Sequence, residues 1–173
     1  MTLQDQLYEE AVAAHAPALE RLARSYELDR EKRRDLLQDV HLALWRSFAG
    51  FEGQCSLRTW IYRVAHNVAA THVARHRRQR ARGLVSLDDI AALPVDDDAD
   101  VAVDRRKALD QLYALIHRLK PLEREVILLY LEGLDAASIG EITGISASNA
   151  ATRIHRIKKI LTTRFQEGDP HAR

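Results

Sequence analysis

The stretch LDAASIGEITGISASNAATRIHRIKKIL, from Leu134 to Leu161, decides the fold, because its pattern predicts two helices joined by a tight turn. Ile139 and Ile142 are three residues apart and therefore share one face of a short helix. Gly144 follows at a place where a chain leaving a helix often needs a positive φ. Ser146 is a good N-cap for a second helix. The stretch therefore predicts a helix-turn-helix.

The second helix of this motif has two faces of different chemistry. The face expected to be buried is small and apolar, so the two helices can cross closely; it consists of Ala147, Ala150, Ile154, Ile157 and Leu161. The outer face carries hydrogen-bonding and cationic side chains: Ser148, Asn149, Thr152, Arg153 and Arg156. These groups suit base edges and phosphates in a DNA major groove, and no acid lies between Glu141 and Glu167 to repel a phosphate. A solvated helix on a helical bundle is the alternative, but the turn, the cap and the charge together favour DNA binding.

The composition indicates an all-helical protein with a true core. Of the 173 residues, 46% are hydrophobic, and glycine and proline are scarce. The single cysteine, Cys55, excludes a disulfide scaffold. The first residues lack the pattern of a signal peptide, and the longest apolar run, Val126 to Leu131, is too short to span a bilayer. We therefore expect a soluble, cytoplasmic protein with no direct membrane insertion.

Helical periodicity and breaks divide the chain into two small helical domains and two irregular segments. Asp29 and Ser56 are expected to cap the second and third helices of the first domain, and Pro121 and Gly133 to begin and end a central helix of the second. The expected parts are a first module, a flexible acidic linker, a second module with the helix-turn-helix, and a disordered tail, over residues 1–79, 80–104, 105–166 and 167–173.

The formal net charge of +1 hides a strong segregation of sign along the chain. The third helix of the first module begins apolar and ends as RHRRQRAR, from Arg75 to Arg82, with no acid between Glu52 and Asp88. Such a helix is suited to lie along nucleic acid; a solvated, fraying helix end is the alternative. The linker has the opposite sign, with Asp88, Asp89, Asp96, Asp97, Asp98, Asp100 and Asp104 and no Lys or Arg between residues 83 and 104.

Three segments in this order resemble the bacterial RNA polymerase sigma factors of the sigma-70 family, specifically the compact extracytoplasmic-function (ECF) group. They are DLLQDVHLALWRSF from Asp35, SLRTWIYRVAHNVA from Ser56 and GISASNAATRIHRIKKIL from Gly144. The resemblance covers about Tyr8 to Phe165. It implies a protein that binds core RNA polymerase and directs promoter recognition and melting, without being an enzyme and without a cofactor or metal.

The resemblance also implies roles by position. The loop over residues 49–55 is similar to one that captures a flipped base of the −10 element, and the linker to a segment that enters the polymerase cleft. Implied partners are core RNA polymerase through its β′ clamp and β flap, promoter DNA and an anti-sigma factor. Implied contacts with core polymerase are Asp35, Gln38, Asp39, Leu42 and Trp45. Implied −10 contacts are Arg63, Asn67, Arg75 and Arg78, and implied −35 contacts are Ser148, Asn149, Thr152, Arg153 and Arg156.

Three positions depart from the family pattern. Many members have Asp where this chain has Thr71, a larger apolar residue in place of Ala150, and Lys in place of Ala151. The first departure bears on the −10 preference, and the last removes one expected phosphate contact.

Two other classes of protein fit parts of the sequence. A helix-turn-helix repressor or activator would use the first module for sensing or dimerisation and would bind duplex DNA tightly alone. A metal-dependent enzyme would use His66, His72 and His76 on the third helix, where His72 and His76 have an i,i+4 spacing that can bind a metal. Without an acid or cysteine nearby, we interpret these two as ordinary polar surface or phosphate-contacting residues.

Overall fold

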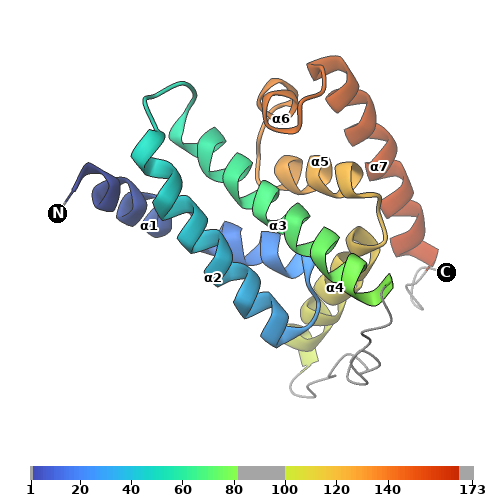
Figure 1. Cartoon of the computed structure of the whole chain (residues 1–173). Helices are drawn as coiled ribbons and strands as arrows, with labels where there is room; N and C mark the ends of the chain where they lie inside the picture. The colour runs from blue at the N-terminus through green and yellow to red at the C-terminus, as the bar shows by residue number, and fades with distance from the viewer. Residues whose placement is uncertain (1, 82–99, 168–173) are drawn as a thin grey trace.

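The computed structural model describes residues 2–81 and 100–167, and within these ranges every regular element is helical (Figure 1). The elements are α1 (Leu3–Tyr26), α2 (Arg30–Ser47), the 3₁₀ turn η1 (Phe48–Gly50), α3 (Leu57–Ala81), α4 (Asp100–His117), α5 (Pro121–Leu131), α6 (Ala136–Thr143) and α7 (Ala147–Glu167). The all-α prediction is confirmed. Helix α3 includes residues 80 and 81 and α4 includes residues 100–104, so both extend into the stretch predicted as linker. The remaining linker residues, 82–99, and the tail residues 168–173 lie outside the described part.

Local sequence signals begin and end these helices as predicted. Asp29 accepts a hydrogen bond from the backbone N–H of Lys32 (2.9 Å), and Ser56 accepts one from the N–H of Thr59 (3.0 Å). Pro121 occupies the first turn of α5, where its missing N–H costs nothing. Two caps were not predicted from the sequence. Thr2 accepts from the N–H of Asp5 (3.2 Å) and begins α1, and Asp135 accepts from the N–H of Ser138 (2.8 Å) and begins α6.

Helices α1, α2 and α3 pack on one another as the first module, and α4 to α7 form the second (Figure 1). Fully buried aliphatic residues form the two cores: Leu19, Leu36, Leu44 and Ile61 in the first, and Ile127, Leu129, Ile139 and Ile157 in the second. Apolar burial of this kind is the main stabilising contribution in each module.

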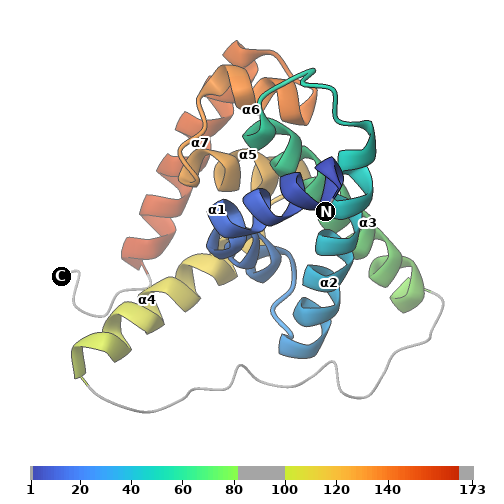
Figure 2. The ribbon, with the colours of Figure 1, turned by 90° about the vertical axis from the view of Figure 1, so that its left-hand side faces the viewer.

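The two modules also contact each other directly. Helix α4 packs on α1, while α5 and α6 pack on α3. Figure 2 shows α1 beside α4, with α2 and α3 on the opposite side of α1 from α4. This direct packing of the two modules was not predicted from the sequence. None of the described helices is long and apolar enough to cross a membrane.

Candidate nucleic-acid interface

The helix-turn-helix is formed by α6, a tight turn and α7. Gly144 ends α6 in the left-handed region at φ 76°, and the Ser146 hydroxyl accepts from the N–H of Asn149 (3.2 Å) to begin α7. Gly140 makes the turn possible, because a Cβ there would lie 2.6 Å from the Ile145 carbonyl oxygen. Ala150 is fully buried where α7 crosses α6. Both predicted signals, the glycine and the serine, are confirmed, whereas Gly140 was not recognised from sequence.

The faces of α7 agree with the predicted division except at its first residue. Ile154, Ile157 and Leu161 are buried, but Ala147 is exposed, so its prediction as a buried residue is wrong. Ala147 is the first residue of α7, at the turn, where its backbone N lies near Gly140 of α6 while its side chain stays exposed. The outer residues point away from the core: Ser148, Asn149, Thr152 and Arg156 are exposed and Arg153 is half-buried.

The arginines of this outer face have defined partners. The Arg153 Nε donates to the Asn149 side-chain oxygen (2.8 Å), one turn earlier on α7. Arg156 donates to the Glu123 carboxylate near the start of α5, and the same carboxylate oxygen lies 4.0 Å from Arg153 Nη1. The Thr152 hydroxyl donates to the Ser148 carbonyl (2.9 Å). The helix therefore presents arginines that are held in place by neighbouring side chains.

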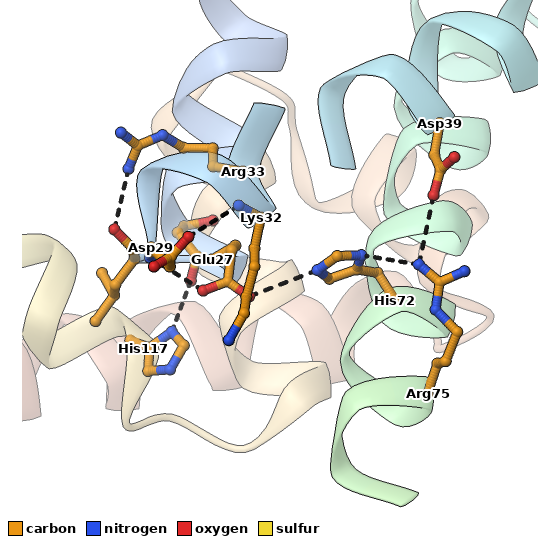
Figure 3. Close-up of polar contacts among 10 residues, drawn as sticks. Glu27, Asp29, Lys32, Arg33, Asp39, His72, Arg75 and His117 are labelled. Atoms are coloured by element: carbon orange, nitrogen blue, oxygen red, sulfur yellow. Dashed lines mark hydrogen bonds and ion pairs between the residues drawn. The ribbon is translucent and has the colours of Figure 1, made fainter. Parts of the chain in front are cut away.

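The four residues proposed for the −10 element lie on one face of α3, because their spacing keeps them within about a third of a turn. Asn67, Arg75 and Arg78 are exposed, and Arg63 is about one-third exposed. Within the described part of the chain, two of the four have acidic partners. Arg75 lies 3.6 Å from Asp39 of α2 and beside His72 (Figure 3), and Arg63 donates to the Glu141 carboxylate of α6 (3.2 Å).

An open groove of about 600 Å³ runs between α2 and α3. It brings together residues that the sequence analysis assigned to different partners: Asp39 and Leu42 to polymerase, and Asn67 and Arg75 to DNA. Thr71, the first departure from the family pattern, also lines this groove, and its hydroxyl donates to the Asn67 carbonyl (2.8 Å). The two functions expected of the first module therefore share one surface.

The remaining residues proposed for polymerase contact form an exposed stripe along α2. Asp35 and Gln38 are exposed, and the apolar side chains of Leu42 and Trp45 remain 45% and 40% accessible, which is unusual for residues of this size. The Trp45 indole N–H donates to Asp5 (3.1 Å) at the start of α1. An exposed stripe of acids and large apolar groups is suited to a protein partner.

Two of the three histidines of α3, His66 and His72, are buried within the first module. His66 is buried, its Nδ1 is 3.0 Å from the Tyr26 hydroxyl, and burial lowers its pKa to about 3. His72 is also buried, 3.5 Å from Glu27 (Figure 3), so its interpretation as a surface or phosphate-contacting residue is wrong. No group of three metal-ligating side chains exists among the described residues. Packing of α3 against α1, which sequence spacing does not reveal, buries these rings.

Contacts between the modules centre on Glu132, at the end of α5. Its two carboxylate oxygens accept from the Arg21 guanidinium of α1 (2.7 Å each), and the Tyr62 hydroxyl approaches the same group (3.4 Å). Arg58 of α3 donates to the Glu132 backbone carbonyl. A further ion pair joins Arg24 and Asp110. In each of these contacts a cation or hydroxyl of the first module meets an acceptor of the second.

Comparison with known proteins fits this arrangement. A family model for sigma-70 region 2 matches residues 11–79, and one for sigma-70 region 4 matches residues 109–161. The RNA polymerase sigma factor CarQ of Myxococcus xanthus is 33% identical over 152 residues, which cover 86% of this chain and 83% of CarQ. The chain belongs to the sigma-70 family. As a sigma factor, it directs promoter recognition in transcription initiation by RNA polymerase.

Other relatives agree with this placement. The sigma factor NccH of Alcaligenes xylosoxydans is 26% identical, and the match covers 90% of this chain and 84% of NccH. The ECF sigma factor SigX of Bacillus subtilis is 28% identical, and the match covers 77% of this chain and 70% of SigX. Among solved structures, the sigma factor RpoE, crystallised with the anti-sigma factor NepR from Bartonella quintana, matches with a TM-score of 0.70 at 21% identity over 94% of this chain and 98% of RpoE. At that identity the structural match shows the fold alone.

Proposed function

We propose that this sigma factor works as an ECF-type factor with four contacts, two with core polymerase and two with promoter DNA. The exposed stripe of α2 docks on the β′ clamp of core polymerase, and the second module docks on the β flap. Helix α3 contacts the −10 element through Arg63, Asn67, Arg75 and Arg78. Helix α7 contacts the −35 element through Ser148, Asn149, Thr152, Arg153 and Arg156. The observation that carries the proposal is the outer face of α7, where polar and cationic groups face solvent on a helix-turn-helix.

The contacts between the modules suggest that the chain without polymerase adopts a closed form, in which the second module packs on the first and partly covers α3. The Arg63 Nη2 donates to the Glu141 carboxylate and backbone carbonyl, so Glu141 competes with DNA for this guanidinium. Binding to polymerase would then separate α3 from α6 and expose the −10 surface. Two structurally similar sigma factors, RpoE and CnrH, were solved with anti-sigma partners, so we expect an anti-sigma factor for this chain as well.

The same proposal assigns the catalytic step to polymerase and none to the chain itself. The sigma factor needs no cofactor in this scheme, because base edges and phosphates are bound by side chains alone. Its place of action is the cytoplasm, where the polymerase and promoter DNA are found.

Co-purification with core RNA polymerase, followed by transcription from a randomised promoter library, tests the proposal. The wild-type chain should bind core and select a −35 and a −10 sequence. Asp39→Arg should weaken core binding but leave the fold intact, since the exposed Asp39–Arg75 pair contributes only about 0–1 kcal/mol. Glu20→Arg, an equal charge reversal at an exposed site of α1, is the matched control and should bind core normally. Equal core affinity of both variants would remove the α2 surface from the proposal.

A further inference from the structure

Glu123 is an acid in an unexpected place, because it lies beside a helix proposed to face DNA phosphates. It belongs to the first turn of α5, and its side chain is only 16% exposed. An acid near DNA lowers affinity through repulsion of phosphate. Glu123 therefore does not serve to raise the overall affinity for DNA, and its role must be a different one.

The geometry around Glu123 suggests that reason. One of its carboxylate oxygens accepts from Arg156 and lies 4.0 Å from Arg153 Nη1. Arg153 is held from a second side by Asn149, whose oxygen accepts from its Nε (2.8 Å). Glu123 comes from α5 and Asn149 from α7, so the two anchors approach the guanidinium from different helices. Arg153 is correspondingly the less exposed of the two arginines, at 29% against 57% for Arg156.

We propose that Glu123 is a positioning residue for −35 discrimination: it orients Arg153 and Arg156 on the DNA-facing side of α7 and offsets part of their charge. The inference rests on the proposed function of α7. A free arginine can reach several phosphates, whereas an oriented one can form a bidentate contact with only one base edge. Charge compensation by Glu123 weakens the contact with phosphates of any sequence. Both effects lower non-specific binding relative to specific binding.

The proposal predicts an unusual pattern for Glu123→Gln, which keeps the shape of the side chain and removes its charge. Binding of the holoenzyme to all −35 sequences should become stronger and more salt-dependent. The preference for the selected −35 sequence over single-base variants should fall by about tenfold, in line with the loss of an oriented arginine contact. Loss of helix stability alone would instead weaken binding to every sequence.

The experiment uses holoenzyme assembled from core polymerase and the full chain, with −35 duplexes selected by the wild type from a randomised library. Glu31→Gln, which removes the first-turn acid of α2, is the matched control for the loss of a helix-terminal charge. The wild type, Glu123→Gln, Arg153→Ala/Arg156→Ala and the triple variant are compared for discrimination, salt dependence and thermal unfolding. If Glu123 acts through the arginines, Glu123→Gln should change nothing further in the background that lacks them.

The outcomes separate this inference from the function on which it rests. A wild type that selects no −35 sequence would overturn the proposed function of α7. A wild type that selects one, with Glu123→Gln showing the same discrimination and salt dependence, would leave that function in place and overturn the role of Glu123. Equal effects of Glu123→Gln with and without the arginines would also overturn it.

Discussion

At the scale of single residues, the contacts proposed for α7 should separate by type. Arg153→Ala is expected to lower holoenzyme affinity for the selected promoter by about 1–3 kcal/mol and to relax specificity at one base pair, because an oriented guanidinium contacts a base edge. Lys159→Ala should weaken all promoters similarly and flatten the salt dependence, because an exposed lysine contacts phosphate. Competition binding on promoter variants measures both.

One result would contradict a base contact by Arg153. If Arg153→Ala lowers binding to every sequence by the same factor, Arg153 is a phosphate contact only. Lys159 is a better partner for this comparison than Lys158, whose ammonium donates to the Tyr130 hydroxyl (3.2 Å) and lies over the same ring.

Glu125 of α5 provides a residue-scale test of burial through pH. Burial raises the pKa of its carboxyl to about 7, from 4.5 in an unfolded chain. The folded state therefore binds the proton more tightly, so the penalty for the buried charge is complete above pH 7 and disappears as the pH falls to 4.5. Glu125→Gln should stabilise the fold above pH 7 and have little effect below pH 4.5. Denaturant unfolding at several pH values measures the difference, and a pH-independent effect would contradict the burial of this charge.

Burial of His66 makes the stability of the fold depend on pH in the opposite direction. Its contribution is present in both the wild type and Glu125→Gln. Its pKa in the fold is about 3, against 6.5 unfolded, so its neutral form stabilises the fold above pH 6.5 and this contribution is lost as the pH falls. Between pH 6.5 and pH 3, the free energy of unfolding falls by about 1.4 kcal/mol for each pH unit because of His66. Because the His66 contribution cancels between wild type and Glu125→Gln, their difference reports on Glu125 alone.

At the scale of elements, the turn of the helix-turn-helix depends on two glycines for different reasons. Alanine normally stabilises a helix interior by about 1 kcal/mol over glycine, but at Gly140 the sign should reverse, because the new Cβ would overlap the Ile145 carbonyl. Gly140→Ala should cost about 1–3 kcal/mol through overpacking. Gly144→Ala meets no neighbouring atom but retains φ 76°, which costs roughly 1–2 kcal/mol.

Thermal unfolding and −35 binding of the two glycine variants give the comparison. We expect both to lose −35 affinity along with stability, since each disturbs the angle between α6 and α7. If Gly140→Ala is as stable as wild type, the Ile145 carbonyl can move away from the new Cβ without a loss of stability, and the steric argument is contradicted.

Sequence predicted several of these elements from local signals, although the local caps Thr2 and Asp135 were not recognised. Asp29, Ser56 and Ser146 cap helices as expected, because a cap bonds to a backbone N–H only three residues away. The position of Gly144 was likewise predictable from its own backbone requirement. Gly140 was not, because its reason is a carbonyl oxygen brought near by the turn itself. The same limit applies to the candidate site: the face of α7 followed from periodicity, but the anchoring of its arginines by Glu123 depends on how α5 crosses α7.

At the scale of the whole molecule, no sequence signal indicated that the modules would contact each other. Glu132 and Arg21 are far apart in the chain, and their pairing depends on the packing of α5 beside α1 and α3. The charge segregation along the chain was visible, but it pointed to the acidic linker. The structure instead places acids of the second module, Glu132, Glu141 and Asp110, against arginines of the first.

Charge reversal at Glu132 tests whether these contacts hold the closed form. Glu132→Arg would place a cation against Arg21 and beside Arg58, so the modules should separate and the radius of gyration from small-angle scattering should increase. Arg21→Glu combined with Glu132→Arg restores one attractive pair and should restore part of the compactness. Glu20→Arg is the matched control and should leave the scattering unchanged. An unchanged radius for Glu132→Arg would show that the ionic contacts do not keep the modules together.

The central claim is that this sigma factor recognises promoters only through polymerase, and fluorescence anisotropy on a labelled promoter duplex tests it most directly. The duplex is one selected by the holoenzyme, and it is titrated with the chain alone and with the chain plus core enzyme. Alone, each module offers one small contact surface, so we expect weak binding of roughly 10⁻⁴–10⁻⁶ M with little sequence preference. Core enzyme should convert this to tight, sequence-specific binding by fixing the spacing of α3 and α7. Nanomolar, sequence-specific binding by the chain alone would contradict the account and favour a conventional helix-turn-helix regulator.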